Sequence, residues 1–200
     1  MTASLPDKPD SAPGRIIIAR HGRPDANREA WLDWRGYEDW WDNIYQPASL
    51  AEGQTAPDAL KEAAAASHTV FASTLQRAIE TAQAVAPGRE LVIDPMFVEA
   101  ELPPPALPGK FMAKTWGVFA RCSWWMGHAR GRESRPEAEA RAEAAVVRLI
   151  EAAAAGPVVL CAHGWFNRMM RPHLRSRDWA CVLDGGDTYW SWRQYEYRPE

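Results

Sequence analysis

Cysteine is scarce in this sequence, and its pattern excludes two common structural uses of the residue. The three cysteines, Cys122, Cys161 and Cys181, include no Cys-x-x-Cys pair, and their number is odd. Neither a disulfide framework nor a zinc site is therefore indicated. We expect buried free thiols in a protein of a reducing compartment.

The sequence also lacks the features that take a chain into a membrane or onto nucleic acid. No apolar run is long enough to span a bilayer, and residues 1–14 are polar, without the apolar centre of a signal peptide. The net charge is −3, so no excess of positive charge draws the whole chain to nucleic acid or anionic lipid. We expect a cytoplasmic protein with no nucleic-acid or membrane partner and a flexible N-terminal tail over residues 1–14.

Hydrophobic residues, by contrast, are plentiful. They make up 46% of the 200 residues, enough for one domain with a sizeable core, predicted over residues 15–200. Short β-branched runs predict strands, and helical spacing between turn signals predicts helices. The predicted strands are 15–19, 68–73, 90–94 and 158–162, and the predicted helices are 56–66, 74–86, 136–155 and 165–175.

The order of these elements predicts the fold class. Strands that alternate with helices favour an α/β fold, a three-layer sandwich with a mostly parallel central sheet and helices on both faces. Residues 184–187, "DGGD", predict a turn that leads into a final alternating strand over residues 188–197.

Two aromatic segments and a proline-rich one predict a small lid. Residues 31–45 and 111–130 are rich in tryptophan, and the prolines of residues 101–110 require an extended connection. Gly36 weighs against a continuous helix in the first aromatic segment. The tryptophans could stack on a substrate, or they could pack in a core or a subunit interface. Four of them are candidates for a pocket wall: Trp34, Trp41, Trp116 and Trp124.

Chemically active side chains follow each of the four predicted parallel strands. In open α/β sheets, ligands bind beyond the carboxyl ends of the strands, so these side chains are expected at one edge. Each alone is more often structural or on the surface, but together they indicate a site. They are Arg20-His21-Gly22 after the first strand, Ser73 and Arg77 after the second, Glu99 after the third and His163-Gly164 after the fourth.

This set of residues suits an anion better than a metal ion. Arg20 and Arg77 would repel a divalent cation, and metal sites need more carboxylate or thiolate ligands than the pattern supplies. A guanidinium group can donate two parallel hydrogen bonds to two oxygens of one phosphate group. The glycine after each histidine would let the backbone come close and leave an amide free to face the anion. We therefore expect no metal and no cofactor.

Five segments, in order along the chain, resemble the motifs of the histidine phosphatase superfamily, which includes the phosphoglycerate mutases. "ARHGRPDAN" (19–27) is similar to its first motif, and "LAEGQTA" (50–56) to the segment before its first main helix. "STLQRAIETA" (73–82) and "VVLCAHG" (158–164) resemble its second arginine and second histidine motifs. "DPMFVEAELP" (94–103) matches the spacing of its acidic segment, which places the acid at Glu99. The resemblance covers roughly residues 15–170.

The resemblance implies a mechanism for the hydrolysis of a phosphomonoester. His21 would be the nucleophile and form a phosphohistidine, while Arg20, Arg77 and His163 would hold the phosphoryl oxygens. Glu99 would protonate the leaving oxygen and then activate water. Glu101 is an alternative acid, because an extended segment would point both carboxylates the same way. Further substrate-binding candidates are Gly22, Asn27, Arg23, Gly164 and Trp165, with Arg23 a candidate for a second acidic group.

Three functions stay open at this point. The short segment between Glu99 and the 136–155 helix favours hydrolysis over a mutase-type phosphotransfer, which needs a larger enclosing lid. A non-catalytic phosphate-binding module is the third possibility. The presence of all five residues of the implied mechanism argues against it: Arg20, His21, Arg77, Glu99 and His163. The expected partner is a small phosphate ester of unspecified identity, and either a monomer or a homodimer is compatible with the sequence.

Overall fold

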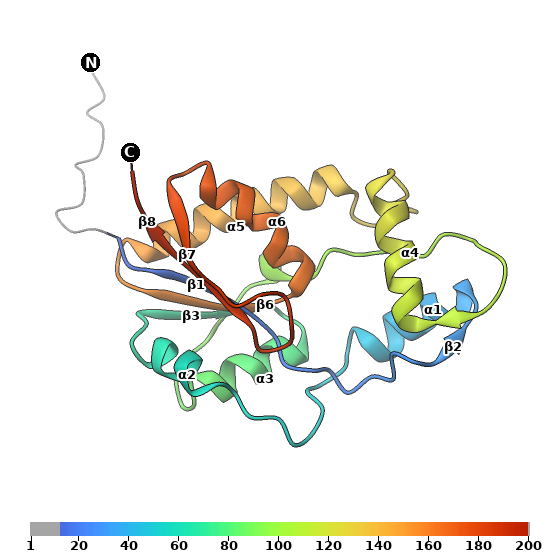
Figure 1. Cartoon of the computed structure of the whole chain (residues 1–200), viewed down its shortest axis with the longest axis horizontal. Coiled ribbons are helices and arrows are strands. Elements are labelled where there is room, and N and C mark those ends of the chain that lie inside the picture. The colour runs from blue at the N-terminus through green and yellow to red at the C-terminus, as the bar shows by residue number, and fades with distance from the viewer. Residues whose placement is uncertain (1–12, 200) are drawn as a thin grey trace, which may run out of the picture.

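A six-stranded sheet forms the centre of the computed structural model, which describes residues 13–199 (Figure 1). The strand order is β4-β3-β6-β1-β8-β7. The first four strands pair in parallel, and β8 and β7 add an antiparallel edge. The strands are β1 (Ile16–Arg20), β3 (Thr69–Ala72), β4 (Val92–Ile93), β6 (Val158–Ala162), β7 (Trp179–Asp184) and β8 (Trp192–Tyr197).

Helices cover both faces of this sheet, as the alternation of elements predicts. The helices are α2 (Asp58–Ala65) and α3 (Gln76–Val85) on one face, and α5 (Arg135–Ala153) and α6 (Gly164–Arg175) on the other. Successive side chains of a strand point to opposite faces. Ile16 and Ile18 accordingly pack with residues of α5 and α6, whereas Ile17 and Ala19 pack with residues of α2 and α3. The three-layer α/β prediction is confirmed.

Local signals in the sequence explain where the long helix α5 begins and how close it lies to the sheet. Ser134 and Glu137 form a capping box, in which the Glu137 side chain accepts hydrogen bonds from both the main-chain N–H and the hydroxyl of Ser134. Pro136 stands in the first turn, where its missing N–H costs nothing. Small residues on the face toward the sheet, Ala142, Ala145 and Ala153, are fully buried and allow close packing.

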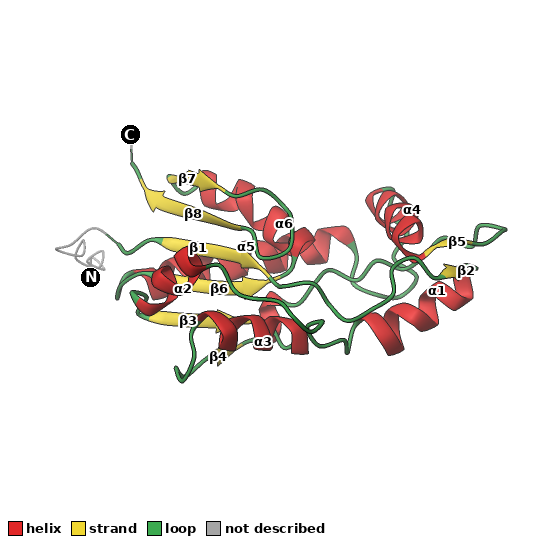
Figure 2. Cartoon of the chain, turned by 60° about the horizontal axis from the view of Figure 1, so that its bottom comes forward, coloured by secondary structure: helices red, strands yellow, loops and turns green. Residues whose placement is uncertain are grey.

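A second group of elements lies beyond the carboxyl ends of the parallel strands (Figure 2), and buried aromatic side chains form its core. It contains the two-stranded sheet of β2 (Trp31–Leu32) and β5 (Phe111–Met112), the helix α1 (Trp34–Trp40), its π-helical extension η1 (Trp41–Tyr45) and the helix α4 (Ala113–Trp125). We call these elements the lid. The buried Trp116 ties it together, because its indole N–H donates to the Leu32 carbonyl at 2.7 Å.

Gly36 does not interrupt the first lid helix. The Asp33 side chain accepts from the Gly36 N–H at 2.8 Å, which caps α1 and satisfies one of its free amides. Buried Tyr37 and Trp40 then anchor the helix in the lid, so tertiary packing outweighs the low helix propensity of glycine.

Two further expectations need correction, and a third concerns residues that lie mostly outside the described range. The edge strand β7 has no counterpart in the prediction because most of its residues are exposed and show no burial pattern, and β8 begins at Trp192 rather than 188. Cys161 is buried, but Cys122 on α4 and Cys181 on β7 are exposed free thiols. The tail expected over residues 1–14 lies, apart from Pro13 and Gly14, outside the described residues.

Local residues in the sequence explain the structure of the remaining connections. Residues 101–110 contain no regular helix or strand, as their prolines require. Asp94 caps the short 3-10 turn η2 (Pro95–Phe97) that leads to Glu99. Within residues 13–199, no helix has both the length and the apolar character needed to cross a membrane.

Truncation of a buried residue on α5 tests the core. Leu149 is fully buried between α5 and the sheet, so Leu149→Ala should lower the free energy of unfolding by about 2–5 kcal/mol. Val147, on the same helix, is 39% exposed, and Val147→Ala should cost less than about 1 kcal/mol. Urea denaturation followed by circular dichroism measures both values. Equal losses would contradict the assigned helix face.

Candidate active site

His21 follows β1 directly, and its imidazole is held in one tautomer. Its main-chain N–H donates to the Ala162 carbonyl at 2.9 Å and continues the ladder between β1 and β6. The Nδ1 atom lies 2.6 Å from the Gly22 carbonyl oxygen. A carbonyl oxygen can only accept, so Nδ1 carries the proton and Nε2 carries the lone pair. Nε2 is the atom that a nucleophilic histidine needs free.

Burial keeps this imidazole neutral. His21 is 2% exposed, and the loss of solvent lowers its pKa well below the ordinary value for histidine. The guanidinium groups of Arg77, Arg20 and Arg28 lower this pKa further, while the Gly22 carbonyl raises it in part. At neutral pH the ring is therefore uncharged and able to attack.

His163 lies beside His21, with the two ring centroids 5.0 Å apart. It follows β6, is fully buried, and its Nε2 hydrogen-bonds the Ser73 hydroxyl at 2.5 Å. Burial, followed by the nearby His21, Arg77 and Arg20, lowers its pKa. Within the described chain its Nδ1 atom has no hydrogen-bond partner. Buried polar atoms are rarely left unpaired, so this atom is available to a ligand.

Arg77 is a fully buried cation whose partners are neutral oxygens. It stands on α3, and Nη1 donates to the carbonyls of Tyr45 and Gln46, both at 2.8 Å. Nη2 donates to the Gln46 side chain at 3.3 Å, and Nε is unpaired among residues 13–199. Burial lowers the pKa of Arg77, although the charge of Glu99 raises it in part. The lid therefore orients this guanidinium without neutralising its charge.

Arg20 faces the same region from the end of β1. Its Nη1 donates to the Asp187 carbonyl, and its Nε has no partner within the described residues. A Cβ atom on Gly164 would lie 2.9 Å from the Arg20 Nε, so the glycine after the second histidine makes room for this side chain. The glycine after the first histidine has another role. The Gly22 N–H donates to the Thr81 hydroxyl at 3.0 Å and is not free for an anion, contrary to expectation.

Glu99, rather than Glu101, faces the cavity. The N–H groups of Trp165 and Phe166, in the first turn of α6, donate to its two oxygens at 3.2 and 2.8 Å. This contact fixes the carboxylate at a helix N-terminus, where negative charge is favoured. Glu101 instead lies 3.4 Å from Arg132 and does not line the cavity.

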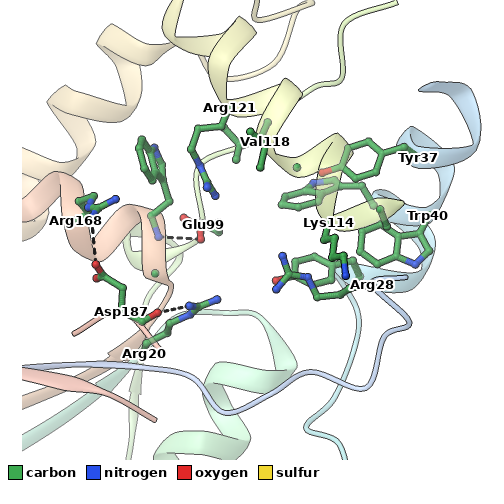
Figure 3. A pocket seen from close by; sticks show the side chains of 17 residues that line it. Arg20, Arg28, Tyr37, Trp40, Glu99, Lys114, Val118, Arg121, Arg168 and Asp187 are labelled. Atoms are coloured by element: carbon green, nitrogen blue, oxygen red, sulfur yellow. Dashed lines mark hydrogen bonds and ion pairs between the residues drawn. The ribbon is translucent and has the colours of Figure 1, made fainter. Parts of the chain in front are cut away.

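The cavity itself has a volume of about 250 Å³ and lies between the sheet edge and the lid. Figure 3 shows Arg20, Glu99 and Arg121 on one side of it, with Arg28, Lys114, Tyr37 and Trp40 across from them. Of the predicted residues, the cavity lining contains Arg20, Glu99, Gly164, Trp165 and Trp41. His21, Arg77 and His163 are buried and are not among the residues that line this cavity.

Several predicted binding residues lie elsewhere. The Arg23 and Asn27 side chains are exposed and do not line the cavity, and Asn27 accepts from the Glu29 N–H at 2.9 Å. Gly22 packs against the Trp190 ring, where an added Cβ would lie 2.5 Å from ring atoms. Of the four candidate tryptophans, Trp34, Trp116 and Trp124 do not line this cavity.

Sequence reasoning missed most of the cationic lining. Arg28, Lys114, Arg121 and Arg168 all face the cavity but belong to no recognised motif. One usable signal was present. Lys114, Val118 and Arg121 recur at helical spacing on α4, which places two cations on one helix face. Arg121 lies over the Trp165 ring at 4.4 Å, and burial lowers its pKa.

Comparison with known proteins agrees with this geometry. The sequence profile of the histidine phosphatase superfamily (branch 1) matches residues 16–199. The chain belongs to this superfamily. The comparison with curated proteins gave no match.

Several solved structures share the fold. A structure named mycobacterial hydrolase 1 is 23% identical, with 90% of this chain and 88% of that chain covered and a TM-score of 0.61. A mycobacterial glucosyl-3-phosphoglycerate phosphatase is 23% identical, with coverages of 92% and 96% and a TM-score of 0.59. Phosphoserine phosphatase from Entamoeba histolytica, in complex with 3-phosphoglyceric acid, is 16% identical, with coverages of 82% and 80% and a TM-score of 0.53.

The buried histidines predict a specific dependence of stability on pH. Below about pH 6.5 the unfolded chain takes up protons on His21 and His163, but the folded chain does not, because both pKa values are lowered. The unfolded state then binds more protons, so stability is retained above this pH and falls as the pH decreases below it. Each histidine contributes a slope of up to about 1.4 kcal/mol per pH unit.

In His21→Gln the free energy of unfolding should therefore fall less steeply between pH 6.5 and 5, because one of the two buried histidines is no longer there to take up a proton on unfolding. Urea denaturation at several pH values measures the slope. His68→Gln, which removes an exposed histidine at the opposite end of β3 from Ser73, serves as the control and should keep the wild-type slope. A slope in His21→Gln equal to that of the wild type would contradict a neutral, buried His21.

Proposed function

We propose that this histidine phosphatase superfamily protein hydrolyses a small phosphomonoester through a phosphohistidine on His21, without a metal ion. One observation carries the proposal. A neutral imidazole with a free Nε2 lies among buried donors of Arg20, Arg77 and His163 that lack partners within residues 13–199. A phosphoryl group supplies the oxygens that these donors lack.

The first half-reaction transfers the phosphoryl group to the enzyme. Nε2 of His21 attacks phosphorus, a P–N bond forms, and the bond from phosphorus to the leaving oxygen breaks. Arg20, Arg77 and His163 stabilise the charge on the phosphoryl oxygens, in a site from which water is largely excluded. Glu99 gives a proton to the leaving oxygen, which departs as an alcohol, and the Trp165 and Phe166 N–H groups stabilise the Glu99 carboxylate that results.

The second half-reaction returns the enzyme to its starting state. Water attacks phosphorus, the Glu99 carboxylate takes a proton from this water, and the P–N bond breaks. Inorganic phosphate leaves and His21 is again neutral. Guanidinium groups supply the positive charge that a metal ion supplies in other phosphatases. Within residues 13–199, no three His, Cys, Asp or Glu side chains gather as a metal-binding group.

Removal of the nucleophile tests the reaction directly. His21→Asn should lower the release of phosphate from an aryl phosphate by about 10⁴-fold or more, because it removes the nitrogen that forms the intermediate. The wild-type rate should be unchanged in EDTA. Steady-state assays with a panel of metabolite phosphates measure both effects. Wild-type protein that transfers phosphate only to a second substrate hydroxyl would instead identify a mutase.

The two candidate acids are distinguished by matched substitutions. Glu99→Gln keeps the shape of the side chain but cannot exchange a proton, and it should lower kcat by about 10²–10⁴-fold. Glu101→Gln disturbs only the ion pair with Arg132, so it should stay within about twofold of the wild type. If Glu101→Gln alone lost activity, the assignment of Glu99 would be wrong.

A further inference from the structure

Tyr189 contacts the active site at three points, although no motif singles it out. Its ring centroid lies 5.7 Å from that of His21. The guanidinium carbon of Arg20 lies 4.3 Å above the same ring. Its hydroxyl accepts a hydrogen bond from Arg28 Nη1 at 3.0 Å. One side chain thus joins the nucleophile, a phosphate-facing cation and a cation on the lid side of the cavity.

The turn that carries Tyr189 is firmly fixed. Before Tyr189, the Asp187 carboxylate binds three arginines, Arg168 at 3.2 Å, Arg171 at 2.5 Å and Arg193 at 3.0 Å. After it, Trp190 adopts a left-handed conformation (φ 64°), and its indole N–H donates to the Gln54 side chain at 2.9 Å. A non-glycine residue takes this conformation only when its surroundings impose it. Tyr189 is therefore held in place from both sides.

A neutral aromatic ring suits this position better than an acid would. The face of a tyrosine ring carries partial negative charge and attracts a guanidinium group. A carboxylate in its place would form an ion pair with Arg20 and compete with the substrate phosphate. The phenol stabilises Arg20 and Arg28 and leaves their charge available to an anionic ligand.

We propose that Tyr189 is a positioning residue of this site: its ring holds Arg20 against His21, and its hydroxyl holds Arg28 over the cavity to receive an acidic group on the leaving half of the substrate. This inference rests on the proposed phosphatase function. It assigns the role of recognising a second acidic group to Arg28, in place of Arg23, whose side chain does not reach the cavity. Arg28 is free for this role because its side-chain partner is a neutral phenol.

The experiment compares phenyl phosphate with 3- and 4-carboxyphenyl phosphate, which add a carboxylate to the same skeleton. For the wild type, kcat/KM should be higher for at least one of the two carboxylated substrates than for phenyl phosphate. In Tyr189→Phe this preference should fall about tenfold, mainly through KM, because Arg28 loses the hydrogen bond that orients it. Arg28→Gln should reduce the preference at least as much. Tyr197→Phe, at an exposed tyrosine on β8, is the matched control and should keep the wild-type preference.

The pH dependence of kcat/KM tests the role of the Tyr189 ring separately from the role of its hydroxyl. The groups that face His21 are Arg20, Arg28, Arg77, His163 and Tyr189. Tyr189→Ala would let water reach His21 and raise its pKa toward the ordinary value. Because the neutral ring is the nucleophile, the acid limb of the kcat/KM profile should move to higher pH. Tyr189→Phe keeps the ring and should keep the wild-type limb.

Each outcome is decisive. A wild-type preference for the carboxylated substrate that Tyr189→Phe leaves intact would overturn the role of the hydroxyl, and so would a wild type without any preference. An unmoved acid limb in folded Tyr189→Ala would overturn the role of the ring. If that variant does not fold, the preference of Tyr189→Phe still decides the proposal. A wild type that hydrolyses none of these esters would refute the proposed function instead.

Discussion

Buried positive charge without a matching carboxylate is the constraint on which this site depends. Arg77 lies fully inside the protein, and its partners are the oxygens of Tyr45 and Gln46. An isolated buried charge is costly, by several kcal/mol per ion even after the protein relaxes. Carbonyl dipoles and the face of the Tyr45 ring, 4.8 Å from the Arg77 guanidinium carbon, offset part of this cost. An anion that enters the site would complete the compensation, which is why we propose that the site binds phosphate.

The same constraint explains how the sheet and the lid work together. The parallel strands deliver His21, Arg77 and His163 to one edge, since each follows the carboxyl end of a strand or the turn after it. The lid then supplies the carbonyls that orient Arg77 and the aromatic wall of the cavity. The α6 N-terminus holds Glu99 between these two parts. Neither the sheet nor the lid alone could form the cavity.

The sequence predicts the sheet edge well because local patterns determine it. Short buried strands such as Ile16–Arg20 and Val158–Ala162 are recognisable in the sequence as apolar runs. The end of each strand then fixes the position of the residue that follows it. Glu99 was located by the resemblance of residues 94–103 to the acidic segment of the superfamily. The lining supplied by the lid was mostly missed, because which face of α1 or α4 turns inward depends on packing between segments far apart in the chain. Tyr189 was missed for the same reason: it reaches His21 only through the pairing of β1 with β8.

The central claim is that phosphorus becomes bonded to His21 during turnover. Rapid acid-free quenching of the wild type with a labelled phosphomonoester, followed by peptide mass spectrometry in alkaline solution, measures this directly. The account predicts one phosphoryl group per chain on His21, stable to alkali and lost in acid, and none in His21→Asn. A phosphoryl group on another residue, or rapid turnover with no labelled protein at any quench time, would contradict it.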